Sequence, residues 1–283
     1  MPANLLRSDA LSQIPWLIHG FSTRAGGVSD AYGGHALNLG YTKHDTHGAV
    51  DENRARLLRS LGAVGNGDLW PLVRLKQIHS DVIHRVDHLP EHFLAGDGLV
   101  TAAPRLVIAI QTADCLPVLL ADSKRKAIGA FHAGWRGTLA RIVEKGVGAM
   151  RVHFESQPED LCAAIGPGIA ACCYSVGEEV REQFQSQFAY AADLFREVTE
   201  SDAVHEKYPL LFMTARAPGH SDLGRIIYLD LREANRRQLL AAGVRAKNIS
   251  VLDFCTACRT DLFFSHRAEK GLTGRQMAVV AVS

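Results

Sequence analysis

Residues 106–137 read LVIAIQTADCLPVLLADSKRKAIGAFHAGWRG, and this stretch indicates the fold class. It holds three short runs, Leu106–Thr112, Val118–Ala121 and Ala127–His132, which are rich in Val, Ile, Leu and aromatic residues and are bounded by Pro, Asp or Gly. Such runs are typical of buried β-strands. Directly after them, Thr138–Met150 carries apolar residues at helical spacing. The succession of strand and helix patterns predicts a mixed α/β fold.

The same two patterns extend outward over the whole chain. Further strands are predicted at Trp16–Ser22, Leu72–His79, Val82–Val86, Leu161–Ile165, Arg225–Leu229, Ile249–Leu252 and Gln276–Val282. Further helices are predicted from Val50 to Leu61, where Gly62 can end the helix, and from Asp230 to Gly243. Strand pairs within 72–86 and 106–132 have the spacing of hairpins. Hairpins mixed with helices, and no linker-type segment, favour one α/β domain over residues 1–283 rather than a doubly wound parallel sheet.

The composition excludes several functional classes. The 283 residues contain 31 Lys and Arg against 30 Asp and Glu, so the net charge of +1 gives no broad basic field for nucleic acid or an acidic membrane. The N-terminus lacks the pattern of a secretory signal, and no apolar run approaches the ~20 residues that span a bilayer. Six cysteines are too sparse for a disulfide scaffold. We therefore expect a reduced, cytoplasmic, soluble protein.

Several common catalytic motifs are absent or incomplete. The chain has no phosphate loop of the G-x-x-x-x-G-K-[ST] type and no G-x-S-x-G nucleophile elbow. Gly166–Ala171 imitates a dinucleotide-binding pattern, but Pro167 stands where the turn should enter a helix, so a tight turn is favoured. Cys255 and Cys258 form a lone C-x-x-C without the further ligands of a zinc ribbon, which favours two half-buried thiols in a turn.

Three soft ligands each stand where a strand meets a loop. They are His79 in KQIHSD, Cys115 in QTADCLP and His132 in GAFHAGWRG. Together they would form a His₂Cys site, which suits Zn²⁺ and leaves a fourth position open, as in catalytic zinc sites. The same ligands suit copper, although none of the four Met residues lies beside these motifs. From spacing alone, the reading as ordinary buried core residues is favoured over a metal site.

Two segments have the residue types of an anion site. Ser22–Ser29 reads STRAGGVS and combines Arg24 and Ser29 with the Gly26–Gly27 pair, whose backbone N–H groups can converge on an anion. Arg136 stands at the start of a predicted helix, near the positive end of its dipole. The alternative for both segments is a surface turn with a solvated arginine, and it is favoured on sequence alone.

Many of these strings occur together, in order, in one known family. The segments GFSTRAGGVS, LNLG, QIHSD, DGLVT, TADCLPVLLAD, FHAGWRGT, AIGPGIAACCYSVGEEV, LDLREAN and FFSHR with GLTGRQMAVV make the chain resemble the YfiH family from about residue 17 onward. Members of this family have been called polyphenol oxidases or laccase-domain proteins and are now described as purine nucleoside phosphorylases. One departure is Cys258-Arg259, where relatives often carry a run such as Asn-Pro, and it leaves the role of that loop open.

The resemblance implies a fold, a metal and an activity. The fold is a single α/β domain of layered mixed β-sheets flanked by helices, in the order alpha-beta-beta-alpha, akin to the catalytic domain of cytotoxic necrotizing factor. The metal is zinc, held by the residues matching His79, Cys115 and His132. The activity is phosphorolysis of adenosine, inosine and 5′-methylthioadenosine, together with deamination of adenosine. Purine nucleosides and phosphate would be the partners.

Residue types suggest how the work is divided in such a site. Asp114 is expected to shuttle protons, and Gln77 to orient substrate. Arg24 with the Gly26–Gly27 turn and Ser29, or alternatively Arg136, is expected to hold phosphate. Two other functions stay open: a copper-dependent phenol oxidase that uses the same three ligands, and a factor that edits peptidoglycan precursors.

Overall fold

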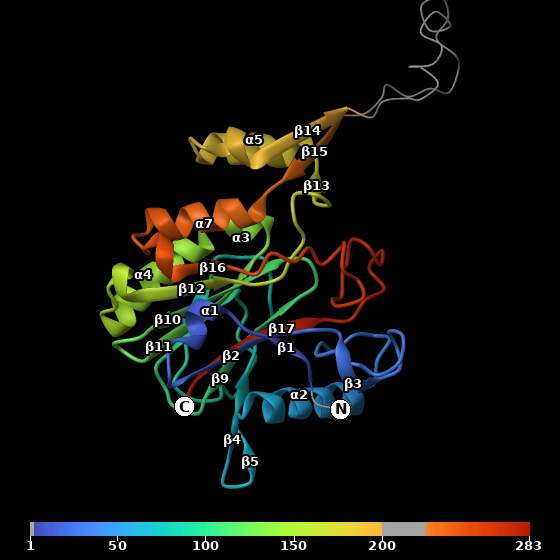
Figure 1. Cartoon of the computed structure of the whole chain (residues 1–283), viewed down its shortest axis with the longest axis vertical. Helices are drawn as coiled ribbons and strands as arrows, with labels where there is room; N and C mark the ends of the chain where they lie inside the picture. The colour runs from blue at the N-terminus through green and yellow to red at the C-terminus, as the bar shows by residue number, and fades with distance from the viewer. Residues whose placement is uncertain (1–2, 200–224) are drawn as a thin grey trace, which may run out of the picture. The chain divides into compact units, whose positions relative to one another are not determined.

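The computed structural model describes residues 3–199 and 225–283, and it places the strands of residues 106–137 in two different sheets (Figure 1). The strand before Cys115 belongs to the first sheet, and the two strands after it belong to the second. The chain forms two compact units, Met1–Ala170 with Leu231–Ser283, and Ala171–Asp230. Both of these sheets lie in the first unit. The prediction that residues 1–283 form a single domain stays a prediction.

The first sheet contains five strands. In spatial order they are β1 (Leu5–Leu6), β2 (Leu17–Ser22), β17 (Gln276–Val282), β9 (Val107–Thr112) and β6 (Leu72–Val73). All neighbours are antiparallel except β6 and β9, which are parallel. The last strand of the chain, β17, is therefore the centre of this sheet, because it pairs with β2 on one side and β9 on the other.

The second sheet contains six strands and is also mixed. In spatial order they are β16 (Ile249–Val251), β12 (Leu161–Ile165), β10 (Leu116–Asp122), β11 (Ala127–Ala133), β8 (Gly98–Thr101) and β7 (Ile83–Arg85). The pairs β12 with β16 and β7 with β8 are parallel, and the rest are antiparallel. Every residue of β10 and β11 is buried, because both faces of the sheet are covered.

The two sheets pack face to face, and alternation along β9 shows how. Ile108 and Ile110 point toward the second sheet, where they join a core that includes Leu119 and Ile128. The intervening Val107 and Ala109 point the other way, into a core with the leucines of helix α2 (His47–Leu61). Since successive side chains of a strand alternate between faces, one strand supplies two separate cores.

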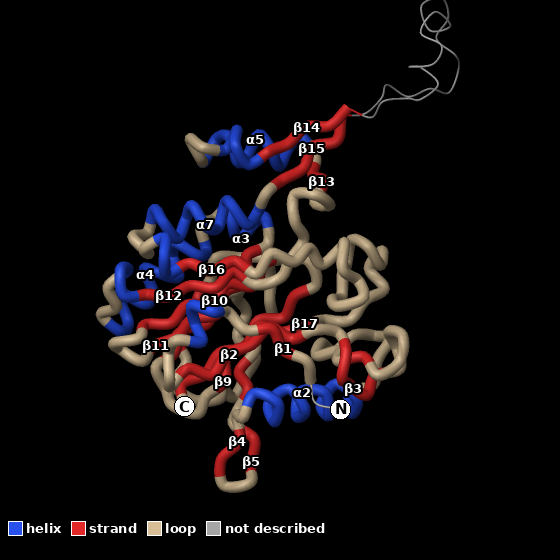
Figure 2. The backbone as a smooth tube through the Cα atoms, viewed as in Figure 1, coloured by secondary structure: helices blue, strands red, loops and turns tan. Residues whose placement is uncertain are grey.

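Helices cover the outer faces and complete four layers (Figures 1 and 2). Helix α2 covers the first sheet, while α4 (Ile142–Phe154) and α7 (Leu231–Ala241) cover the second. Gly146 of α4 packs so closely on Phe131 of β11 that a Cβ would lie 2.6 Å from the ring.

The remaining elements of this unit are α1 (Asp9–Ser12), β3 (Ala25–Ser29), β4 (Val64–Gly65), β5 (Asp68–Leu69), α3 (Trp135–Leu139) and two 3₁₀ turns, Pro158–Asp160 and Ala246–Asn248. The predicted α/β class with layered mixed sheets and flanking helices is confirmed.

Two predicted hairpins are wrong. Residues 72–79 and 82–86 do not pair with each other, because β6 joins the first sheet and β7 joins the second. Likewise β9 and β10 lie in different sheets, and only β10 and β11 form the predicted hairpin. Both errors have the same physical cause: short buried strands close in sequence look alike whether they pair side by side or stack across a core. The chain thus crosses from the first sheet to the second after β6 and again after β9, and it returns to the first sheet after β8 and after β16.

The predicted helices are present with altered boundaries. Helix α2 ends at Leu61, and Gly62 follows with φ of 76°, the left-handed cap that its glycine predicted. The predicted helix Thr138–Met150 is two helices, α3 and α4, because Arg141 between them has φ of 61° and breaks the helical backbone. Within the described residues, no helix has the length and apolarity to cross a membrane.

The described residues of the second unit form a small three-stranded sheet with one α-helix. Its strands, in spatial order, are β13 (Ser175–Val176), β15 (Arg225–Leu229) and β14 (Phe195–Thr199), and both pairs are antiparallel. Helix α5 (Glu178–Gln187) packs Phe184 against Phe188 and Phe195, and a 3₁₀ turn, Ala191–Leu194, precedes β14. The predicted strand Arg225–Leu229 is confirmed as β15.

Candidate metal centre

Two crossings from the first sheet to the second, together with the end of β11, bring three soft ligands together. His79 lies in the first crossing, between β6 and β7, and Cys115 lies in the second, between β9 and β10. His132 is the penultimate residue of β11 and pairs with Pro117 of β10. Their ligand atoms all lie within 4.8 Å of one another. The structure therefore gathers the three residues that the sequence singled out.

The cluster is anchored on one side and open on the other. His132 is 4% exposed, Cys115 is partly buried, and His79 is exposed. The imidazole rings of His79 and His132 meet edge to face, with their centroids 4.9 Å apart. Gly134 closes the cluster from the β11 side, since a Cβ there would lie 3.0 Å from Cys115 Sγ. A side chain at position 134 would fill space that the ligand atoms need.

Charge in the cluster favours a thiolate beside an imidazolium. Burial alone would raise the pKa of the Cys115 thiol, but the charge of His132 and hydrogen bonds from both imidazoles outweigh it and lower that pKa to about 6. Burial would likewise lower the pKa of His132, yet Cys115 and Asp97 raise it to about 9. A thiolate and two imidazoles are the donor set that zinc and copper prefer, so the residues fit a metal ion.

Sequence reasoning missed one important residue, Asp97. Its carboxylate is fully buried, and Oδ1 accepts a hydrogen bond from Nδ1 of His132 at 2.8 Å. Burial would raise the pKa of Asp97, but hydrogen bonds from His132 and Ser80 lower it to about 2. Asp97 precedes Gly98 at the start of a strand, and an Asp-Gly pair at such a position is typical of an ordinary turn. The only available signal was the DGLVT string of the family resemblance.

Asp114 holds the backbone next to Cys115. Its φ of 90° is rare for a residue with a side chain, and its carboxylate accepts hydrogen bonds from Thr256 Oγ1 at 2.6 Å and the Arg267 amide at 2.7 Å. The predicted tight turn at Gly168 lies against it, because a Cβ there would meet the Asp114 carbonyl oxygen at 2.8 Å. Both carboxylate oxygens of Asp114 are thus engaged within the protein.

Gln77 is engaged in a similar way. Its amide nitrogen donates to the Gln111 carbonyl and its amide oxygen accepts from the Gln111 backbone N–H, both at 2.8 Å. The side chain therefore imitates a strand partner for the end of β9, two residues from His79 in sequence. It ties the first crossing to the first sheet.

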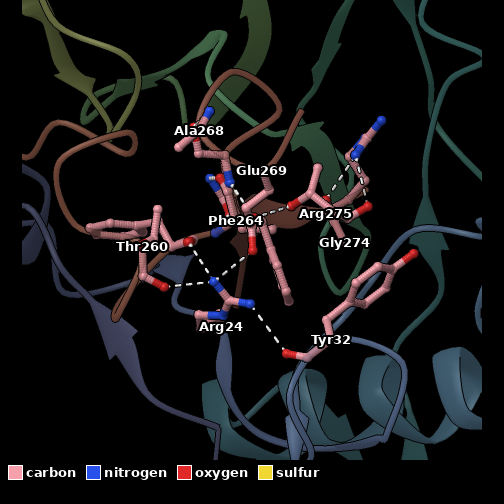
Figure 3. A network of polar contacts seen from close by, with 12 residues as sticks. Arg24, Tyr32, Thr260, Phe264, Ala268, Glu269, Gly274 and Arg275 are labelled. Carbon is pink, nitrogen blue, oxygen red and sulfur yellow. Dashed lines mark hydrogen bonds and ion pairs between the residues drawn. The ribbon is translucent and has the colours of Figure 1, made fainter. Parts of the chain in front are cut away.

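Arg24 lies in a network of main-chain oxygens rather than facing an open anion site (Figure 3). One guanidinium nitrogen donates to the Thr260 carbonyl at 2.6 Å and to Glu269 at 3.1 Å, and the other donates to the Tyr32 carbonyl at 3.2 Å. The guanidinium carbon also lies 4.8 Å from the ring centroid of Phe264. These contacts tie the turn after β2 to the loop before β17.

Gly26, Gly27 and Ser29 lie in strand β3 rather than in the predicted turn, and they too make internal contacts. Gly26 has φ of 94°, and a Cβ on Gly27 would lie 2.6 Å from Asn53 Oδ1. Ser29 is fully buried and donates to Asp45 at 2.6 Å. Asn53 of α2 accepts from the Val28 amide and donates to Ser29 Oγ, both at 2.8 Å. These glycines allow β3 to pack on α2.

Arg136 differs from Arg24 because its guanidinium group is free to contact a ligand. It is exposed, it follows the candidate ligand His132 by four residues, and its guanidinium carbon lies 4.4 Å from the ring centroid of Trp135. Within residues 3–199 and 225–283, no carboxylate or carbonyl accepts from it. Of the two arginines that the sequence offered as phosphate ligands, Arg136 is the one with unused donors.

Comparisons with known proteins identify the family and agree with the fold. A family model described as "Multi-copper polyphenol oxidoreductase laccase" matches residues 18–283. A purine nucleoside phosphorylase of Deinococcus radiodurans is 40% identical over 98% of this chain and 92% of its own, and the purine nucleoside phosphorylase YlmD of Geobacillus stearothermophilus is 32% identical over 93% and 89%. The crystal structure of the Bacillus licheniformis hypothetical protein YfiH superimposes with a TM-score of 0.80 at 32% identity, covering 100% of this chain and 97% of that one.

Proposed function

The chain belongs to the laccase/YfiH family, and from that premise we propose that it is a zinc-dependent purine nucleoside phosphorylase that also deaminates adenosine. The observation that carries the proposal is the convergence of the ligand atoms of His79, Cys115 and His132 within 4.8 Å, with His79 exposed. The names of the relatives supply the substrate class, purine nucleosides with phosphate. The proposed substrates are adenosine, inosine and 5′-methylthioadenosine.

The ligand set favours zinc in a catalytic setting. Three protein ligands leave one position for water or substrate, which is the pattern of catalytic rather than structural zinc sites. When bound, the ion would supply Lewis acidity, which acidifies water or polarises a substrate atom. The lowered pKa of Cys115 keeps its sulfur deprotonated at neutral pH, and the exposed side of His79 leaves an approach for substrate.

Phosphorolysis requires an anion placed against the sugar. The bond between C1′ and the purine nitrogen breaks, a bond between C1′ and a phosphate oxygen forms, and the purine gains a proton. We propose that Arg136 holds the phosphate, because its guanidinium donors are not engaged and it lies four residues from His132. Arg24, Gly26, Gly27 and Ser29, the other predicted phosphate ligands, would then shape the neighbouring loops.

Asp114 and Gln77 stay in the proposal as predicted catalytic residues. In deamination, water adds at the purine C6 and ammonia leaves, so a proton must move, and Asp114 adjoins Cys115. Both carboxylate oxygens of Asp114 and both polar atoms of the Gln77 side-chain amide already make hydrogen bonds within the protein. These bonds favour a structural role for both side chains, namely holding the backbone beside the site. The contacts of these side chains therefore support positioning more than proton transfer.

Copper-dependent phenol oxidation is the second candidate, favoured by the His₂Cys donor set and by the family description. Purified protein separates the two candidates. A zinc enzyme is colourless and contains zinc by elemental analysis, whereas a copper enzyme with a thiolate ligand has a visible charge-transfer band. We also propose a reducing, cytoplasmic location, supported by the low number of cysteines, six in 283 residues, which is too sparse for a disulfide scaffold.

The decisive assay uses adenosine and inorganic phosphate, with products separated by chromatography. Adenine and ribose 1-phosphate are expected from phosphorolysis, and inosine from deamination. Cys115→Ser should abolish both activities, while the matched variant Cys162→Ser, in β12 and away from the ligands, should retain them. Turnover of adenosine by Cys115→Ser at the wild-type rate would overturn the proposal.

A further inference from the structure

We infer that Asp97 is the positioning residue of the metal centre: one buried carboxylate sets the orientation of His132 and the backbone of His79, and thereby the affinity for the metal ion. This inference rests on the proposed metal centre but not on the proposed substrates. It concerns the ion itself, so a measurement of metal binding tests it without any turnover.

Asp97 accepts five hydrogen bonds, and all of them come from the ligands or their neighbours. Oδ1 accepts from His132 Nδ1 at 2.8 Å and from the His79 backbone N–H at 3.1 Å. Oδ2 accepts from the Ile78 and Ser80 backbone N–H groups, at 3.1 and 2.6 Å, and from Ser80 Oγ at 2.8 Å. A fully buried carboxylate is costly unless it is this well satisfied.

The contact with His132 selects the ring nitrogen that faces the metal. When Nδ1 carries the proton and donates to Asp97, Nε2 is the nitrogen left to bind an ion. The backbone confirms that this geometry is fixed from both sides, since the His132 N–H donates to the Asp97 carbonyl at 2.8 Å. Without the carboxylate the ring could turn or change tautomer, and its lone pair would no longer be directed.

The contact with residues 78–80 holds a strained ligand. His79 has φ of 58°, the left-handed region that side chains disfavour. Three successive backbone N–H groups around it converge on one carboxylate, an arrangement suited to a negative charge. Glycine would adopt this backbone more easily but has no imidazole. Asp97 therefore allows a histidine to occupy a turn that its own conformational preference opposes.

The test is the zinc affinity of Asp97→Asn, measured by competition with a chromophoric chelator at fixed pH. Asparagine keeps the size but replaces one acceptor oxygen with a donor, so we expect a loss of roughly 10- to 100-fold. The cobalt-substituted variant should also show a shifted thiolate-to-cobalt band. Asp122→Asn is the matched control, because Asp122 is 1% exposed, accepts the Lys124 and Arg125 amides, and lies at the other end of β10 from Cys115. Its zinc affinity and cobalt spectrum should equal those of the wild type.

Wild-type zinc affinity and an unchanged cobalt spectrum in Asp97→Asn, or equal losses in Asp97→Asn and Asp122→Asn, would overturn the inference. The wild-type protein gives a second test that needs no variant. Long-range proton–nitrogen spectra of its zinc-loaded form should show the His132 proton on Nδ1, and a proton on Nε2 would contradict the inference. If the wild type binds zinc through these ligands yet turns over no nucleoside, the proposed function fails and the role of Asp97 stands.

Discussion

Gly134 lies directly against Cys115: a Cβ built on the glycine would come within 3.0 Å of the cysteine Sγ and 3.3 Å of His79 Cδ2. The backbone at Gly134, with φ of −72° and ψ of 174°, is one that any residue adopts. The absence of a side chain is therefore required by the ligand atoms and not by the chain conformation.

Gly134→Ala should consequently weaken zinc binding without unfolding the protein. We expect a loss of roughly tenfold, the lower end of what a disturbed ligand environment costs, measured by chelator competition. Gly148→Ala is the control, since no atom lies within 4 Å of a Cβ at this exposed position of α4. The control should keep its zinc affinity and gain about 0.5–1 kcal/mol of stability. Equal zinc affinities in the two variants would show that the space at Gly134 is not used.

Substitutions of Arg136 and Arg24 should differ in their effect on the KM for phosphate. Arg136→Ala is expected to raise the KM for phosphate at least tenfold, because a charge-assisted contact is worth roughly 1.5–3 kcal/mol. Arg24→Lys should lower the melting temperature, because lysine cannot reach three acceptors at once, while the KM for phosphate stays within twofold. A raised phosphate KM in Arg24→Lys with an unchanged value in Arg136→Ala would reverse the assignment.

Asn53 should be a strong determinant of stability. It is fully buried in α2 and bonds to the Val28 amide, to Ser29 Oγ and to two carbonyls of the loop after β3. Asn53→Ala leaves these groups without partners, so we expect a loss of roughly 2–4 kcal/mol in urea unfolding. The adjacent Glu52→Gln, whose side chain is 42% exposed, should cost less than about 1 kcal/mol. Similar losses in both variants would contradict the role of Asn53 as the anchor of β3 and the loop after it.

His19 should make the fold sensitive to mild acid. Burial, and then the charge of Arg7, lower the pKa of this histidine from 6.5 to about 4, and its Nε2 accepts the Ser8 amide. Above pH 6.5 the ring is neutral in the folded and the unfolded chain, so it has no effect. As pH falls from 6.5 to 4, only the unfolded chain gains the proton, which removes roughly 3 kcal/mol of stability.

The measurement is urea unfolding of the wild type and His19→Gln at pH 7 and pH 5. Glutamine can accept the Ser8 amide but does not titrate in this range. The stability lost between the two pH values should be smaller in the variant. Equal losses in both proteins would assign the acid sensitivity to other groups.

Most helices and strands could be predicted, because each is specified by a residue pattern within its own segment. Gln276–Val282 and Leu161–Ile165 are continuous apolar runs, and they form β17 and β12 with the predicted bounds. Which strands pair is decided by contacts distant in sequence. Ile108 and Val107 point to opposite faces of β9 and pack into two different cores. No local sequence pattern distinguishes a strand that pairs with the preceding strand from one that crosses to a second sheet.

The residues of the candidate site differ in the same way: some could be predicted from the local sequence, and others depend on contacts distant in sequence. His79, Cys115 and His132 could be singled out as candidate ligands because each places a soft donor at a strand end, and the structure brings the three together, although their spacing alone favoured ordinary core residues. Asp97 could not be singled out in this way, since its importance comes from two segments, 78–80 and 132, that the sequence separates from it by 17 to 35 residues. Arg24 resembles a phosphate ligand in sequence, but three of its acceptors, the Thr260 and Phe263 carbonyls and the Glu269 carboxylate, lie more than 230 residues away.

The central claim is tested most directly by one experiment on the purified protein: zinc content measured alongside adenosine phosphorolysis before and after chelation. The account predicts about one zinc per chain, release of adenine and ribose 1-phosphate only when phosphate is present, loss of both products after chelation, and recovery when zinc is restored. Undiminished phosphorolysis by metal-free protein, or a zinc-loaded protein that leaves adenosine, inosine and 5′-methylthioadenosine unchanged with phosphate present, would contradict it.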